Sequence, residues 1–211
     1  MSATQAALSR RFDRWALTYD QGALQPLYGN AHRAVLGAAA AMDLSPRRIL
    51  DVGCGTGRLI GELVDLFPAA TIVGLDLSAG MVSAARASVP KGRTVFCQAV
   101  AERLPFACAS FDLVTATVSF RHWIDQYAGL REIARVLSPA APLLLAGVGD
   151  PPRRPRRGVV LPAPLQRAAL ARNHLTLRTV ERIAGFGPVS ELTMVVATRR
   201  RRSPCRDHSH R

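Results

Sequence analysis

Short apolar runs alternate with amphipathic segments from residue 48 onward. The apolar runs predict strands at 48–52, 71–75, 93–98, 111–118 and 142–148. The segments between them repeat apolar residues at helical spacing and predict helices at 57–67, 79–87 and 122–138. Strands that alternate with helices pair in parallel through right-handed crossovers. The pattern therefore predicts an α/β fold with a doubly wound, mostly parallel sheet.

Helical spacing also predicts elements on both sides of this alternation. Residues 4–17 and 24–42 form an expected N-terminal helical extension that covers one edge of the sheet. Residues 162–172 and 177–184 are predicted as helices, followed by a closing β pair at roughly 188–198. We therefore expect one domain over residues 1–198. Its predicted parts are a helical cap (1–45), a ligand-binding core (46–150) and a substrate-side region (151–198), with a disordered basic tail at 199–211.

The chain has 211 residues and a formal net charge of +13, which is distributed unevenly. Residues 1–150 carry 14 basic and 12 acidic groups, whereas residues 151–211 carry 14 basic and 3 acidic groups. Four arginines in the Pro-rich segment 150–158 suit an anionic substrate, a carrier protein or an acidic membrane surface, unless this is simply a solvated loop. No aromatic interleaving or recognition-helix pattern indicates specific nucleic-acid binding.

Other composition features exclude several classes of protein. No apolar run approaches the ~18 residues that a membrane span needs. The N terminus has no apolar signal core, so we expect a cytoplasmic location. The four cysteines contain no C-x-x-C pair, so we expect reduced thiols and no metal site.

A glycine-rich loop follows the first predicted strand: Asp51-Val52-Gly53-Cys54-Gly55-Thr56-Gly57. Glycines at such a strand–helix turn permit a tight turn and close approach of a ligand to the backbone. A dinucleotide fingerprint would need its third glycine at the position of Arg58, which argues against NAD or FAD. Asp76 ends the next strand, where a carboxylate can accept hydrogen bonds from two ribose hydroxyls. The alternative role for Asp76 is to cap the following helix.

These residues, taken in order, resemble class I S-adenosylmethionine-dependent methyltransferases of the type 11 group. The loop resembles that family's motif I, and Asp76-Leu77-Ser78-Ala79-Gly80-Met81 resembles its D-x-S-x-x-M block. Two later blocks also match, namely 101–114 and 132–139. The lead-in Arg11-Phe12-Asp13 with Thr18-Tyr19-Asp20 resembles the menaquinone- and biotin-pathway subgroup. The resemblance implies a Rossmann-like seven-stranded sheet.

The resemblance also implies which residues bind S-adenosyl-L-methionine and its product S-adenosyl-L-homocysteine. They are Tyr19, Asp51, Gly53, Gly55, Asp76, Leu77, Met81, Ala101, Glu102 and Ser119. By this comparison Asp51 would hold the ammonium group and Asp76 the ribose hydroxyls. Ser119 would lie near the sulfonium, and Tyr19 would close over the carboxylate. No metal is implied.

Two positions depart from the family pattern. Val100 replaces the acid of the adenine block, and Ala140-Ala141 replaces a Gly-Gly turn. These departures support an alternative in which the chain is a non-catalytic S-adenosyl-ligand or polyanion-binding module that kept the fold.

His122 is the candidate catalytic residue because it follows the fourth predicted strand, at the edge where ligands of such sheets bind. A histidine there could act as a general base, or it could simply open the next helix and pack. The segment 118–120 lacks the Asn/Asp-Pro-Pro-Tyr signature of enzymes that methylate base or glutamine nitrogens. We therefore expect O- or C-methylation of a small-molecule acceptor, with its identity and the oligomeric state left open.

Overall fold

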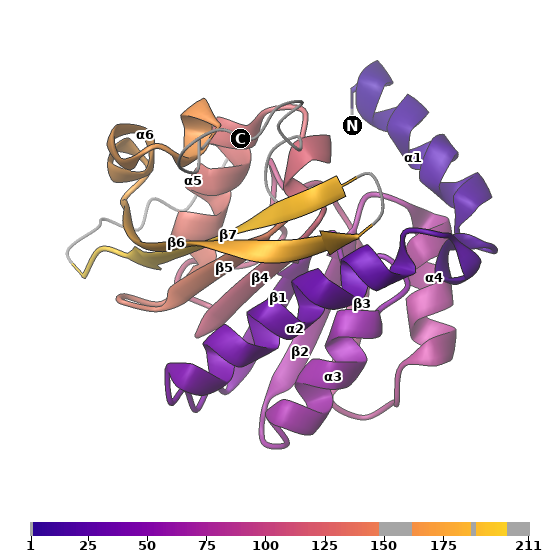
Figure 1. The fold of residues 1–211 in the computed structure, drawn as a ribbon, viewed down its shortest axis with the longest axis horizontal. Coiled ribbons are helices and arrows are strands. Elements are labelled where there is room, and N and C mark those ends of the chain that lie inside the picture. The colour runs from indigo at the N-terminus through magenta and orange to yellow at the C-terminus, as the bar shows by residue number, and fades with distance from the viewer. Residues whose placement is uncertain (1, 148–161, 187–188, 202–211) are drawn as a thin grey trace.

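A seven-stranded sheet forms the centre of the protein (Figure 1). The structure is a computed structural model that describes residues 2–147, 162–186 and 189–201. Its strands are β1 (Arg48–Val52), β2 (Thr71–Asp76), β3 (Thr94–Gln98), β4 (Leu113–Thr117), β5 (Pro142–Ala146), β6 (Leu175–Phe186) and β7 (Val189–Arg199). They lie in the order β3-β2-β1-β4-β5-β7-β6. The first five are parallel, and β7 runs antiparallel to both of its neighbours. The predicted doubly wound, mostly parallel sheet is therefore confirmed.

Helices cover both faces of the sheet and bury two apolar clusters against it. The helices are α1 (Ala3–Trp15), α2 (Gln25–Ala41), α3 (Arg58–Leu66), α4 (Ala79–Ser88), α5 (Gln126–Val136) and α6 (Arg167–Arg172), with 3-10 turns at Tyr19–Gln21, Phe120–His122 and Ala163–Leu165. One cluster joins the sheet to α2, α3 and α4, and the other joins it to α5 and α6. Each sheet face is thus sealed by apolar side chains, as a parallel sheet requires.

The predicted helix over 177–184 is wrong, because these residues belong to strand β6, which pairs with β7. The register between the two strands shifts between Leu177 and Thr179. This irregularity breaks the two-residue alternation, so that Leu177, Val180 and Ile183 recur every three residues and imitate a helix. Similarly, the helix predicted over 122–138 starts later, at Gln126.

The C-terminal region differs in detail from its prediction. Strand β7 continues through Arg199, which is only 3% exposed and pairs with Leu175, so this residue does not belong to a disordered tail. The arginine-rich segment 150–158 and residues 202–211 lie outside the described residues. Cys54 and Cys97 are free thiols, whereas Cys108 is disulfide-bonded, which corrects the expectation of four reduced thiols. None of the described helices is both long and apolar enough to cross a membrane.

Candidate functional site

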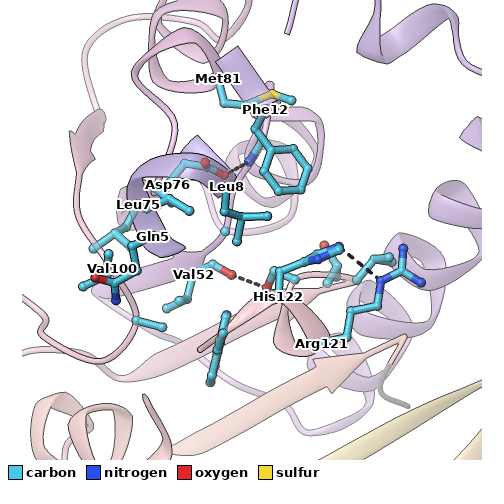
Figure 2. Close-up of a pocket in the computed structure, with 18 of the residues that line it drawn as sticks. Gln5, Leu8, Phe12, Val52, Leu75, Asp76, Met81, Val100, Arg121 and His122 are labelled. Carbon is cyan, nitrogen blue, oxygen red and sulfur yellow. Dashed lines mark hydrogen bonds between the residues drawn. The ribbon is translucent and has the colours of Figure 1, made fainter. Parts of the chain in front are cut away.

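The carboxyl ends of strands β1, β2 and β4 open into a cavity of about 270 Å³ (Figure 2). Parallel strands bring their carboxyl ends to the same edge of a sheet, so the loops that follow them lie side by side. Helix α1 supplies the opposite wall. The cavity therefore lies between the ligand edge of the sheet and the N-terminal extension.

The turn after β1 requires glycine at position 53. Gly53 has φ +78°, and a Cβ atom built on it would lie 2.3 Å from the Cβ atom of Ser119. Ser119 is held at this place because its hydroxyl donates a hydrogen bond of 2.7 Å to the carbonyl oxygen of Val52. Glycine at position 53 therefore lets the loop pack against Ser119, and Gly53 itself lines the cavity.

Asp76 joins the glycine loop to the helix that follows β2. Its Oδ2 accepts a hydrogen bond of 3.0 Å from the Gly55 amide, and its Oδ1 accepts one of 2.8 Å from the Ser78 amide. Each oxygen of a carboxylate can accept a second hydrogen bond. Burial raises the pKa of Asp76. Asp76 lines the cavity and is 8% exposed, so its remaining acceptor positions suit a ligand with hydroxyl groups.

Asp51 lies in β1, two residues before Gly53, and does not line the cavity. Its Oδ1 accepts a hydrogen bond of 2.8 Å from the Thr115 hydroxyl, while its Oδ2 has no hydrogen-bond partner among the described residues. The side chain is 1% exposed, and burial raises its pKa to about 7. A buried carboxylate oxygen without a partner is costly, which favours a cationic ligand group nearby.

Helix α1 is fastened across the cavity by polar contacts, and we call it the α1 lid. The Ser9 hydroxyl donates to the carbonyl oxygen of Leu77 (3.1 Å). Asp13 Oδ1 accepts from the Ser78 hydroxyl (2.6 Å) and the Gly80 amide (2.9 Å), and the contact with Ser78 is the main cause of the lowered pKa of Asp13. The lid thus reaches the segment that carries Asp76.

Glu102 connects three parts of the cavity wall. Its Oε1 accepts hydrogen bonds from the amides of Ile124 (2.6 Å) and Asp125 (3.1 Å), and its Oε2 accepts one from Gln5 Nε2 of the lid (3.3 Å). The loop after β3 is therefore tied both to the segment after β4 and to α1. The carboxylate of Glu102 accepts three hydrogen bonds from protein donors, two at Oε1 and one at Oε2.

His122 and Arg121 lie together at one end of the cavity (Figure 2). The Arg121 Nε donates a hydrogen bond of 3.2 Å to His122 Nε2, and the Phe12 ring packs edge-on against the imidazole with centroids 5.3 Å apart. Burial, together with Arg121 and Arg11, lowers the pKa of His122 to about 4. The imidazole is consequently uncharged at neutral pH. Just before this segment Val118 has φ +54°, a strained conformation for a β-branched residue.

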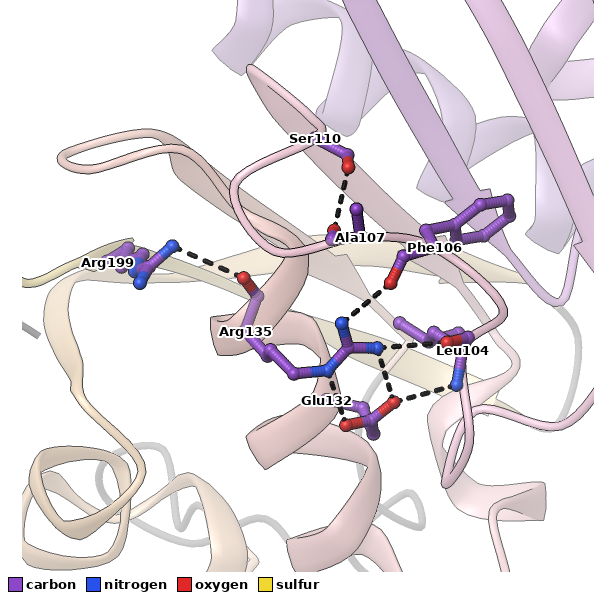
Figure 3. A network of polar contacts seen from close by, with 7 residues as sticks. All are labelled: Leu104, Phe106, Ala107, Ser110, Glu132, Arg135 and Arg199. Carbon is purple, nitrogen blue, oxygen red and sulfur yellow. Dashed lines mark hydrogen bonds and ion pairs between the residues drawn. The ribbon is translucent and has the colours of Figure 1, made fainter. Parts of the chain in front are cut away.

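A buried ion pair between Glu132 and Arg135 contacts the loop after β3 (Figure 3). Glu132 Oε2 accepts from the Leu104 amide (2.9 Å) and lies 2.8 Å from Arg135 Nη2. The Arg135 guanidinium also donates to the carbonyl oxygens of Leu104 and Phe106. The two side chains thus fix the backbone that leads away from Glu102.

The structure brings nearly all of the predicted ligand residues to this one cavity. Those that line it are Tyr19, Gly53, Gly55, Asp76, Leu77, Met81, Ala101, Glu102, Ser119 and His122. Asp51 is the exception. Sequence reasoning missed the wall contributed by α1, namely Gln5, Leu8, Arg11, Phe12 and Trp15, as well as Arg121 and Trp123. The lead-in around Phe12 was a signal, but nothing in its spacing shows which part of the sheet it faces. The described residues contain no cluster of three potential metal ligands.

Comparisons with known proteins agree with this geometry. Residues 50–145 match the family model described as a methyltransferase domain. This part of the chain is therefore similar to methyltransferase domains. A demethylmenaquinone methyltransferase of Deinococcus radiodurans is 43% identical over 51% of this chain and 46% of its own length. A malonyl-[acyl-carrier protein] O-methyltransferase of Methylovorus is 34% identical over 69% of this chain and 51% of its own length. The chain thus spans about half the length of these relatives.

Solved methyltransferase structures share the fold over most of this chain. A Haloferax volcanii methyltransferase, solved in complex with the Trm112 methyltransferase activator, has a TM-score of 0.74 at 21% identity and covers 90% of this chain and 97% of its own. The magnesium protoporphyrin IX methyltransferase of Synechocystis has a TM-score of 0.69 at 19% identity, with 90% and 95% covered. At these identities the likeness concerns the fold of the methyltransferase domain.

Proposed function

We propose that the protein is an S-adenosyl-L-methionine-dependent methyltransferase that acts on the oxygen or carbon atom of a small molecule. The observation that carries this proposal is the buried Asp76 carboxylate, which accepts a hydrogen bond from the Gly55 amide and lines the cavity beside the glycine loop. The relatives are methyltransferases by name, and one of them is named for acyl-carrier protein. We therefore include carrier-bound acceptors in the proposal.

The residues present fit S-adenosyl-L-methionine. The open acceptor positions of Asp76 suit ribose hydroxyls, and Gly53, which lines the cavity, suits the methionine part. A role of Asp51 at the ammonium group stays a prediction, because Asp51 does not line the cavity. Leu77 and Met81 offer apolar surface for the adenine. Val100 lines the cavity and offers no acceptor to the adenine amine. The comparisons do not favour the non-catalytic alternative, because the relatives are named as methyltransferases.

When bound, the cofactor would supply a methyl group on a sulfonium: an electron pair of the acceptor oxygen or carbon would form the new bond, the carbon–sulfur electron pair would stay on sulfur, and any acceptor proton would leave to water or a base. The protein's contribution is to position the acceptor and exclude water, which together can lower a barrier by about 7–11 kcal/mol. Phe12 and Trp15 of the α1 lid close the cavity for this purpose. His122 can take the proton only after Nε2 releases Arg121.

Calorimetric titration with S-adenosylhomocysteine tests the proposal. We expect saturable one-to-one binding by the wild-type protein and at least about tenfold weaker binding by Asp76→Asn, because a charge-assisted acceptor is lost. Asp112→Asn is the matched control, since Asp112 also accepts two backbone amides (3.0 and 3.1 Å) but lies away from the cavity. Equal affinity of Asp76→Asn and wild type would refute the assignment. A cytoplasmic location stays a prediction from the sequence.

A further inference from the structure

The charges that line the cavity are unevenly satisfied. The two acids of the wall, Asp76 and Glu102, accept hydrogen bonds from backbone amides and from Gln5. The two arginines of the wall, Arg11 and Arg121, form no ion pair with any carboxylate of the described residues. Elsewhere in those residues Arg135 and Arg182 do pair with glutamates. The cavity wall therefore carries two solvent-exposed arginines that have no carboxylate partner among the described residues.

Arg121 lies at the His122 end of the cavity, where its guanidinium contacts the imidazole. Arg11 lines the same cavity from α1 and directly precedes Phe12, whose ring packs against His122. The Nε of Arg121 is occupied by His122 Nε2, which leaves the two Nη groups of the guanidinium as the donors for another partner. His122 thus orients Arg121.

The surroundings of this end are apolar and aromatic. Phe12 packs against His122, Trp123 packs edge-on against Phe120 with centroids 5.0 Å apart, and Ile124 and Trp15 also line the wall. An apolar wall with these two guanidinium groups suits a ligand that combines an apolar body with a carboxylate, because guanidinium binds carboxylates with short, charge-assisted hydrogen bonds.

We propose that Arg11 and Arg121 bind a carboxylate of the methyl acceptor, with His122 acting as a positioning residue for Arg121. The inference rests on the proposed function and adds the chemical class of the acceptor: an apolar or aromatic carboxylate. The same chemistry could serve the carboxylate of the methionine part of the cofactor, so the experiment must distinguish the two sources.

Calorimetry on the protein saturated with S-adenosylhomocysteine measures whether the acceptor site binds carboxylates more tightly than neutral amides. The probes are benzoate, 2-naphthoate and octanoate, each beside its neutral amide. We expect at least one carboxylate to bind about tenfold or more tightly than its amide. Arg121→Gln and Arg11→Gln each reduce this preference to threefold or less, and His122→Ala reduces it in part. Arg10→Gln is the matched control, since Arg10 is exposed, lies next to Arg11 and does not line the cavity.

The cofactor arm compares S-adenosylhomocysteine with 5′-methylthioadenosine, which lacks the amino-acid carboxylate. We expect both arginine variants to bind the two nucleosides as tightly as wild type does. If a variant loses affinity for S-adenosylhomocysteine alone, that arginine serves the cofactor and the proposal is overturned. It is also overturned if none of the three carboxylates is preferred over its amide by wild type. A folded wild-type protein that binds neither nucleoside would instead refute the proposed function.

Discussion

The buried carboxylate of Asp51 makes the stability of the ligand-free protein depend on pH. The substitution Asp51→Asn removes this contribution, so the difference from wild type measures it. Asp51 is 1% exposed, and burial raises its pKa from 3.8 to about 7. The folded protein therefore binds this proton more tightly than the unfolded chain does. Its contribution to stability is fully present below pH 3.8 and is lost as the pH rises to about 7.

The size of the effect follows from the pKa difference. A shift from 3.8 to about 7 corresponds to about 4 kcal/mol, since one pKa unit is worth about 1.4 kcal/mol. About two of these units fall between pH 5 and pH 7, so about 3 kcal/mol changes within that window. Asp51→Asn keeps the shape of the side chain and removes the titration. From pH 5 to pH 8 the variant should therefore gain about 3 kcal/mol, or about 8 °C in Tm, relative to wild type.

Thermal unfolding of wild type and Asp51→Asn at half-unit steps from pH 5 to pH 8 measures this difference directly. All other titrating groups are shared, so only the change in the difference between the two proteins matters. Asp65→Asn is the control, because Asp65 is exposed, and its difference from wild type should be constant. Parallel curves for wild type and Asp51→Asn would show that Asp51 is already ionised at pH 5, which would refute the reasoning from burial.

Two further predictions concern polar contacts in the cavity wall and in the loop after β3. Glu102→Ala should speed hydrogen exchange at the amides of Ile124 and Asp125, because these amides lose their acceptor. Glu102→Gln keeps an acceptor and should restore protection. Equal protection in both variants would show that Glu102 does not hold these amides. Glu132→Ala leaves the Arg135 guanidinium buried without its carboxylate and should lower the free energy of unfolding by about 3–5 kcal/mol in urea. The exposed ion-pair variant Glu191→Ala should cost under about 1 kcal/mol, and a similar loss in both variants would contradict the role of burial.

The parts of the site that depend on local pattern could be predicted from the sequence. The glycine loop follows β1 and Asp76 ends β2. Because these strands are parallel, their carboxyl ends lie at the same edge of the sheet. The direction of a side chain within a fully buried strand is not encoded by alternation, because both faces are apolar. The role of Asp51 at the ammonium group is implied by the resemblance alone; in the structure Asp51 is buried and does not line the cavity, and this role stays a prediction.

The parts that depend on distant contacts could not be predicted. The α1 lid had a simple amphipathic pattern, and its partners lie 65–97 residues further along the chain. The strand β6 was mistaken for a helix because its irregular register imitates helical spacing. Ala140 replaces the family's glycine and adopts φ +68°, so the turn keeps a conformation that its residue type disfavours.

The position of the α1 lid has a consequence for how the protein is made. Synthesis begins at the N terminus, so α1 leaves the ribosome before Leu77, Ser78, Gly80 and Glu102, its hydrogen-bond partners, exist. Its docking closes loops of tens of residues, a step that is slow compared with local helix formation. Helix α1 is therefore placed after the partners that are synthesised later than it, and the cavity closes only after β2 and the loop that follows β3 have formed.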